Sequence, residues 1–130
     1  MLIVDSHSFP DIPLPCDVHQ ESNRPDICIG TDTFHTPEWL IDLTKLHFEG
    51  HGYRVELNSP YNGTLVPLRA YHKDERVWSI MIEINRKLYL DDSYQITQPS
   101  FDKLQKCIND LYRTILDRGK SLVTPLENEA

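Results

Sequence analysis

The sequence lacks any concentration of positive charge. Its 13 Lys and Arg residues are outnumbered by 20 Asp and Glu residues, which gives a formal net charge of −7 at pH 7. Nucleic-acid binding is therefore not expected, because no Lys/Arg stripe is present to neutralise phosphates. Long hydrophobic runs are also missing, and the apolar stretches fall far short of the ~20 residues that span a bilayer. The composition predicts a protein that contacts neither nucleic acid nor membrane.

Cysteine is scarce as well, with three residues at scattered positions, Cys16, Cys28 and Cys107. An odd number argues against a disulfide framework and predicts free thiols in a reducing compartment. Because Asp5 follows the first apolar residues directly, no secretory signal peptide is recognisable, and we expect a cytoplasmic location. Cys16 and His19 have the Cys-x-x-His spacing of half a zinc site, but no second Cys/His pair completes it.

Nothing in the sequence suggests repeats or a second domain. A chain of 130 residues with 39% hydrophobic residues can bury one core. We expect a single domain over residues 1–120 and a flexible tail over residues 121–130. Residues 9–26 contain four prolines, which cannot donate hydrogen bonds within a sheet. This segment is therefore predicted to be a long loop outside the sheet, and loops of this length are usually functional or mobile.

The rest of the sequence alternates between strand and helix patterns. Thr36 and Pro37 are typical of a helix start, with a capping hydroxyl and a proline at the first helical position, and this helix should end near residues 50–52. A second helix is expected from Pro99 to Gly119, with apolar residues at helical spacing: Phe101, Leu104, Ile108, Leu111 and Ile115. Strands are expected at residues 2–4, 27–29, 53–58 and 77–85. This order predicts an α/β fold with a mixed, largely parallel sheet flanked by helices.

The first candidate site lies directly after the apolar residues 2–4. Asp5 and His7 are two positions apart, so in an extended segment their side chains lie on the same face. The carboxyl edge of the strands is where open α/β sheets place their ligand sites. A histidine held there by a neighbouring carboxylate has the environment of a metal ligand or a base. The alternative is an ordinary surface or capping histidine.

Glu83 is the second candidate, near the carboxyl end of the strand predicted at residues 77–85. Its neighbours Ile82 and Ile84 alternate with it, so Glu83 lies on the face opposite the isoleucines. A carboxyl group partly removed from water has a raised pKa, which suits a general base near neutral pH. The alternative is that this face of the strand is solvated and that Glu83 points into water.

Other polar residues have weaker indications of a role. Arg24 would bind a carboxylate through two parallel hydrogen bonds, or would form a surface pair with Asp26. Asn58 would contact a ligand through its amide, and so would the side chains or exposed backbone of the following turn. That segment also fits a plain tight turn, in which Asn-Gly supplies positive φ values. The turn residues are Tyr61, Asn62, Gly63 and Thr64. His35 and His51 have no partner in the pattern and are given no role.

Four segments together resemble one family. These segments are residues 2–10 (LIVDSHSFP), 24–32 (RPDICIGTD), 58–64 (NSPYNGT) and 81–89 (MIEINRKLY). In this order they resemble the N-formylglutamate amidohydrolase family, and the resemblance runs from residue 2 to about residue 92. It implies a zinc-carboxypeptidase-like α/β fold, related to that of the aspartoacylases. It also implies a small-molecule substrate, an N-acyl amino acid whose amide is hydrolysed. The characteristic reaction converts N-formyl-L-glutamate to formate and L-glutamate in histidine degradation.

The resemblance also implies roles for individual residues. His7 takes the place of a zinc ligand, and Asp5 orients it. Glu83 takes the place of the general base that activates the zinc-bound water and carries the proton to the leaving amine. The substrate's carboxylates are expected to be held by Arg24, Asn58, Arg86 and the turn formed by Tyr61, Asn62, Gly63 and Thr64.

One departure from the family is large. The family's earlier half carries a Pro-His-Ser-Gly-type segment with the first zinc ligand, a further acidic ligand and an Asn-Arg pair, and none of these is present here. Catalytic zinc uses three protein ligands, whereas the resemblance supplies only His7, unless Cys16, His19 or His35 completes the site. We therefore expect a carboxyl-terminal part of the domain. The alternative function is a non-catalytic binding or interaction domain. An exposed sheet surface would favour a homo-oligomer.

Overall fold

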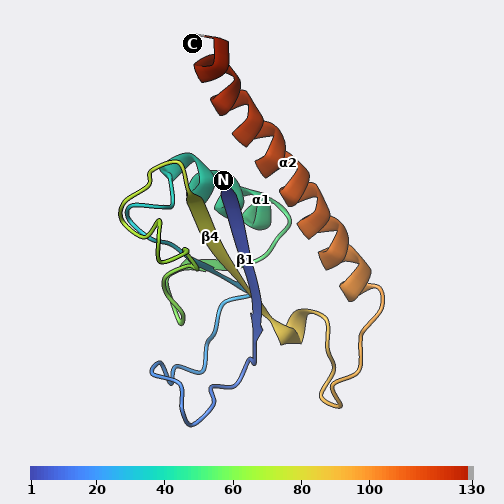
Figure 1. Ribbon diagram of the computed structural model, residues 1–130. Coiled ribbons are helices and arrows are strands. Elements are labelled where there is room, and N and C mark those ends of the chain that lie inside the picture. The colour runs from blue at the N-terminus through green and yellow to red at the C-terminus, as the bar shows by residue number, and fades with distance from the viewer. Residues whose placement is uncertain (129–130) are drawn as a thin grey trace.

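The computed structural model describes residues 1–128, which form one mixed sheet and two main helices. Within these residues the strands are β1 (Leu2–Phe9), β2 (Ile27–Gly30), β3 (Val55–Leu57) and β4 (Trp78–Asn85). The helices are α1 (Glu38–Gly50), the short 3₁₀ helix η1 (Arg86–Leu88) and α2 (Ser100–Asn128). The strand order is β1-β4-β2-β3, with β1·β4 and β2·β3 parallel and β2·β4 antiparallel. The predicted mixed α/β fold is therefore confirmed (Figure 1).

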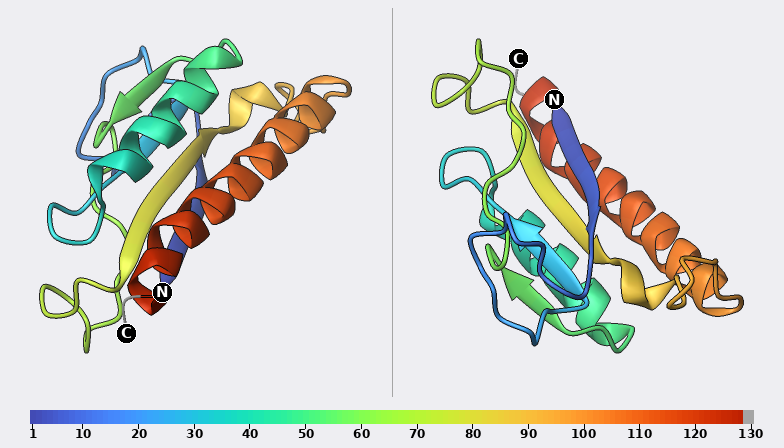
Figure 2. Two further views of the ribbon diagram at one scale, coloured as in Figure 1. Left: turned by 90° about the horizontal axis from the view of Figure 1, so that it is seen from above. Right: turned by 90° about the horizontal axis from the view of Figure 1, so that it is seen from below.

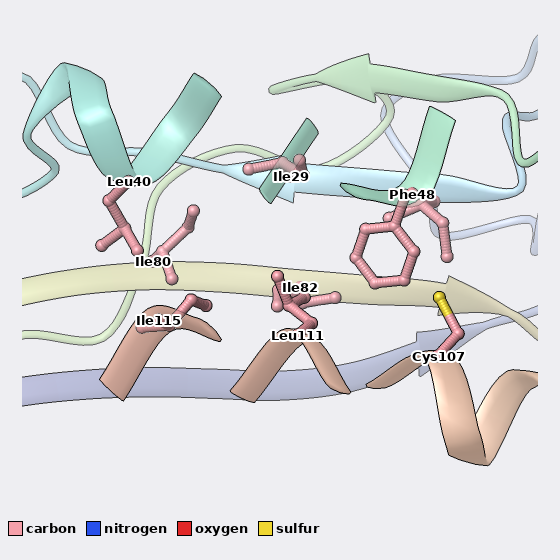
Figure 3. Packing of buried hydrophobic residues seen from close by; sticks show 9 residues of the cluster. Ile29, Leu40, Phe48, Ile80, Ile82, Cys107, Leu111 and Ile115 are labelled. Atoms are coloured by element: carbon pink, nitrogen blue, oxygen red, sulfur yellow. The ribbon is translucent and has the colours of Figure 1, made fainter. Parts of the chain in front are cut away.

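Both main helices cover the same face of the sheet (Figure 2). Period-two alternation along β4 directs Ile80 and Ile82 toward the helices. These two residues form one core with apolar side chains from both helices (Figure 3). The other members of this core are Ile27, Ile29, Leu40, Phe48, Cys107, Leu111 and Ile115. None of the helices described in residues 1–128 combines the length and hydrophobicity needed to cross a membrane.

The opposite face of the sheet is covered by loops instead of helices. Four side chains of β4 lie on this face, Ser79, Met81, Glu83 and Asn85, and all four are buried. The loop that follows β1 crosses this face, and Arg24, which is 3% exposed, anchors the end of the loop. The predicted loop between the first two strands is therefore correct, but it packs on the sheet and buries polar residues.

Three local predictions differ from the structure. β1 does not end at Val4 but continues to Phe9, because β4 offers a parallel partner along its whole length. Helix α2 continues past Gly119 to Asn128, since one glycine costs a helix only about 1 kcal/mol. Residues 121–128 of the predicted tail are thus helical, and residues 129–130 lie outside the described part. Finally, the Thr36 hydroxyl does not cap α1 but donates to the Ser79 carbonyl at 2.7 Å.

Candidate functional site

The two candidate segments meet on the loop-covered face of the sheet. The parallel register of β1 and β4 pairs His7 with Glu83 and Asp5 with Met81. Residues paired across neighbouring strands point to the same face, so Asp5, His7 and Glu83 share the face that lies away from the helices. The sequence predicted that Asp5 and His7 lie beyond the end of a strand. In the structure all three residues lie within strands β1 and β4. The convergence itself follows from the strand pairing.

Asp5 holds the imidazole of His7. Its Oδ1 lies 2.7 Å from His7 Nε2, and its Oδ2 accepts a hydrogen bond of 3.1 Å from the Leu65 amide. A carboxylate only accepts, so Nε2 carries the proton and Nδ1 of the neutral ring keeps its lone pair. The His7 side chain is 50% exposed and that of Asp5 18%. A half-exposed imidazole oriented by a carboxylate is the arrangement in which histidine binds metals.

Glu83 is buried, so the solvated-face alternative is wrong. The residue is 9% exposed, and its Oε2 atom is fully buried and accepts no hydrogen bond. Burial raises the pKa of the Glu83 carboxyl group, the charge of His7 lowers it, Asp5 raises it further and Arg86 lowers it. A largely buried carboxylate whose Oε2 has no hydrogen bond is poised to accept a proton.

A cavity of about 450 Å³ opens beside Glu83. This volume is sufficient for a small molecule. Among the described residues, three buried polar atoms have no hydrogen-bond partner, and two of them belong to residues that line this cavity: Glu83 Oε2 and Arg24 Nε. The third belongs to Thr44 in α1. The cavity is lined by Cys16, Asp17, Val18, His19, Arg24, Pro60, Tyr61, Asn62, Met81 and Glu83.

Arg24 fixes the wall of the cavity. Its Nη1 donates to the Pro10 carbonyl and to the Tyr61 hydroxyl, and its Nη2 donates to Asp17 Oδ2 and to the His19 carbonyl, at 2.9–3.2 Å. These four bonds use all four terminal N–H groups, so only the buried Nε–H has no partner. The ion pair lowers the pKa of Asp17, after the larger effect of the Leu14 amide. The alternative of a surface pair with Asp26 is not observed, because Arg24 pairs with Asp17.

Asn58, Gly63 and Thr64 lie behind the cavity wall and fix its shape. Asn58 adopts a positive φ of 56°, and its side chain bonds the amide and hydroxyl of Thr31 at 2.9 and 2.8 Å. This ties the end of β3 to the end of β2. The Gly63 carbonyl packs so closely on Gly30 that a Cβ atom at position 30 would clash with the carbonyl oxygen. Thr64 bonds the buried hydroxyl of Ser79 at 2.7 Å.

Arg86 lies at the start of η1 and reaches back to β1. Its Nε and Nη2 atoms donate to the hydroxyl and carbonyl of Ser8 at 3.1 and 3.2 Å. Arg86 does not line the cavity, but it lies close enough for its positive charge to lower the pKa of Glu83. Of the predicted substrate-binding residues, the structure groups Arg24, Tyr61 and Asn62 with Glu83 around the cavity.

The described residues do not assemble three metal ligands around His7. His35 is buried, and both its ring nitrogens are engaged, one with the Val77 carbonyl and one with the His72 amide, each at 2.8 Å. It therefore has no free nitrogen for a metal. Cys16 and His19 line the cavity but form no ligand cluster with Glu83.

Sequence reasoning missed several residues. Asp17 anchors Arg24 from an irregular loop, which has no periodic signal to reveal it. Cys28 faces Glu83 across the register of β2 and β4, and burial raises the pKa of its thiol to about 11. Within residues 1–128, one group of three side chains could hold a metal ion: His47, His51 and Cys107. The spacing of four between the two histidines was the available signal, since it places them on one side of a helix.

Known proteins identify the fold and the family. A crystal structure of N-formylglutamate amidohydrolase from Ralstonia eutropha JMP134 superimposes with a TM-score of 0.73 at 23% sequence identity, over 90% of this chain. The chain spans 44% of the length of that protein. No curated protein gives a significant match. The family model for N-formylglutamate amidohydrolase matches residues 1–90, which is more than half of the sequence. The chain therefore belongs to the N-formylglutamate amidohydrolase family.

Proposed function

We propose that this chain carries the general base and one metal ligand for hydrolysis of the amide of an N-acyl amino acid, with N-formyl-L-glutamate as the first substrate to test. The observation that carries the proposal is the buried Glu83 carboxylate, which faces a cavity on the same side of the sheet as the His7–Asp5 pair. Membership of the N-formylglutamate amidohydrolase family supports it.

The role of Glu83 follows from its surroundings. Its raised pKa makes the carboxylate a stronger base than an exposed glutamate, so it accepts a proton from the attacking water. The water oxygen adds to the formyl carbon, the carbon–nitrogen bond breaks, and Glu83 returns the proton to the leaving amine. The products are formate and the free amino acid. Because Oε2 is fully buried, the water would approach the other carboxylate oxygen from the cavity.

The donor types on this face fit a divalent metal ion such as zinc, although their number is low. His7 offers Nδ1 and is oriented by Asp5, as metal-binding imidazoles are. When bound, the ion would lower the pKa of its water toward ~7 and polarise the scissile carbonyl. Because catalytic zinc uses three protein ligands, further ligands must join His7 for full activity.

The cavity suits an anionic substrate. The Arg24 guanidinium lies in the cavity wall and would attract a substrate carboxylate, which would compete with Asp17 for its terminal N–H groups because the Nε–H is fully buried. Tyr61 and Asn62 line the same cavity and would contact the substrate, and Arg86 adds positive charge near Glu83. Asn58, Gly63 and Thr64 would act through the shape of the wall.

A second function has its own support: a binding domain of the same fold without catalysis. The shortage of ligands around His7 among the described residues favours it. The two functions differ in turnover, because only the first releases formate.

The test measures formate released from N-formyl-L-glutamate by the purified chain supplied with zinc. Under the proposal, a chelator and Glu83→Gln each abolish release. Glu56→Gln is the matched control, since Glu56 is on the same face in β3 but pairs with Arg54 at 2.7 Å. Formate release that persists in Glu83→Gln would reject the base. Ligand binding without any formate release in the wild-type chain would favour the binding domain for these residues.

A further inference from the structure

A second group of metal-binding side chains lies between the two helices, on the face of the sheet opposite Glu83. His47 is in the last turn of α1, His51 is the residue that caps this helix, and Cys107 is in α2. Each of the three residues offers one ligand atom, and these atoms all lie within 4.8 Å of one another. His51 is exposed, His47 is partly buried and Cys107 is 1% exposed, so the group extends from solvent to the core.

The hydrogen bonds of both histidines prepare the rings for a metal. His51 Nδ1 bonds the His47 carbonyl, and His47 Nε2 bonds the Cys107 carbonyl, each at 2.8 Å. A carbonyl oxygen only accepts, so these nitrogens carry the protons and the other nitrogen of each neutral ring keeps its lone pair. Metal-binding histidines show this same arrangement, with the second nitrogen held by a backbone carbonyl or a carboxylate.

The charge around the group also favours a cation. The carboxyl end of α1 carries the negative end of the helix dipole, and His47 and His51 both lie there. Asp110, one turn along α2 from Cys107, interacts electrostatically with both His47 and Cys107. Lys103 and Lys106 act in the opposite direction at Cys107, and the ion pair between Lys106 and Asp110 at 2.8 Å reduces the effect of both partners, so the end of α1 makes the main negative contribution.

We propose that His47, His51 and Cys107 form a zinc-binding clasp that joins α1 to α2, separate from the Glu83 site. Imidazole nitrogen and thiolate sulfur are the ligands that zinc prefers. Tetrahedral zinc with Zn–N bonds of about 2.0–2.1 Å and a Zn–S bond of about 2.3 Å keeps its ligand atoms about 3.3–3.6 Å apart. Side-chain movements of about 1 Å would therefore close the site. Binding releases the Cys107 thiol proton to solvent, and a water completes the coordination at the exposed side.

The clasp would hold the long helix α2 against the rest of the fold. Helix α1 and α2 meet through the core around Leu111 and Phe48, and the clasp lies at one end of that contact. Ligand binding to the folded state alone raises stability, so zinc should raise the melting temperature of the chain. This inference does not rest on the proposed hydrolysis.

The experiment titrates the purified, metal-free chain with Co²⁺, which replaces zinc and absorbs light. A cobalt–thiolate bond gives a charge-transfer band in the near ultraviolet, and tetrahedral geometry gives intense visible bands. We expect both at one equivalent, and zinc should remove them. Cys16 is the exposed thiol beside the Glu83 cavity, so Cys16→Ser separates a thiolate band that arises there from one that arises at the clasp.

Variants assign the band to the clasp. His51→Gln changes an exposed side chain and should weaken cobalt binding by about 10-fold or more while leaving the circular dichroism unchanged. It should also remove the rise in melting temperature caused by zinc. Two matched controls, His72→Gln and Cys16→Ser, change an exposed histidine and an exposed cysteine elsewhere and should leave the titration unchanged. Absence of the thiolate band in the wild-type chain, its full retention in His51→Gln, or its loss in Cys16→Ser would each overturn the proposal.

Discussion

Glu83→Gln should make the metal-free protein more stable at neutral pH, although it removes the proposed base. The Glu83 carboxylate is 9% exposed, and its buried Oε2 has no hydrogen-bond partner, so ionisation there is unfavourable. Glutamine keeps the size and shape of the side chain and carries no charge. A functional group kept at the expense of stability is the pattern expected at an active site.

The magnitude follows from the charge that glutamine removes. Glutamine leaves a neutral polar atom at the same buried position, so the gain is only the extra cost of a charge over a neutral group there, and the open cavity beside Glu83 keeps this cost small. We expect a gain of about 1–2 kcal/mol in the free energy of unfolding, which corresponds to about 4–8 °C in melting temperature for a chain of this size.

The pH dependence of the free energy of unfolding provides a second test of whether Glu83→Gln stabilises the protein. The folded-state pKa of Glu83 is raised above its ordinary value of 4.5, so the folded protein binds this proton more tightly than the unfolded chain does. The free energy of unfolding of the wild type therefore falls, through this group, as pH rises from about 4.5 through the folded-state pKa. Below about pH 4 both proteins carry a neutral side chain, and the difference between wild type and Glu83→Gln should vanish.

The assay is urea or thermal unfolding in a chelating buffer, at several pH values between about 4 and 8. Glu56→Gln is the control, because its partly exposed carboxylate pairs with Arg54 and its loss should change stability by less than about 1 kcal/mol. A Glu83→Gln variant that is less stable than the wild type at neutral pH would refute the reasoning, since it would mean that the carboxylate has a favourable partner.

Three further outcomes test other parts of the structure. In urea unfolding, Arg24→Ala should lower the free energy of unfolding by about 3 kcal/mol, because it leaves a buried network unsatisfied. The control Arg54→Ala removes an exposed ion pair and should cost under about 1 kcal/mol. Equal losses in the two variants would contradict the role of Arg24 in fixing the cavity wall. Iodoacetamide near neutral pH should label the exposed Cys16 in the folded protein but should label the buried Cys28, whose pKa is about 11, only after unfolding. Mass spectrometry would detect the labelled residues, and labelling of both in the folded protein would contradict the burial of Cys28. Strand β1 forms one edge of the sheet, so we expect self-association in light scattering that Ser6→Lys reduces; an unchanged oligomer would place the interface elsewhere.

The fold was predictable where local pattern and tertiary structure agree. The alternation along β4 assigned Ile80 and Ile82 to the core and Glu83 to the other face, and the structure agrees. Helix α2 was predicted from its apolar period, but Phe101 and Ile108 are only partly buried, whereas Cys107 is buried. A helical period identifies an apolar stripe without fixing which members lie at its centre, because that depends on where α1 crosses.

Long-range partners explain the remaining differences. The Thr36 hydroxyl has the local signal of a cap, yet it bonds a strand 43 residues away. β1 extends to Phe9 because of β4, which lies far along the chain and leaves no mark on the sequence of residues 5–9. The burial of Glu83 is of the same kind, since it depends on a loop without any period that Arg24 and Asp17 hold in place.

Polar groups within the loop-covered face differ in how they are satisfied, and this difference identifies the site better than any single residue type. On the loop-covered face, Ser79 bonds Thr64 and the Leu65 carbonyl, and Asn85 bonds Asp11 and the Pro25 carbonyl. Buried polar groups in folded proteins are nearly always satisfied in this way. At the cavity, by contrast, one acceptor on Glu83 and one donor on Arg24 both have no partner. Both residues line the cavity, so under the proposed function an N-acyl amino acid and its attacking water would lie beside these two unsatisfied groups.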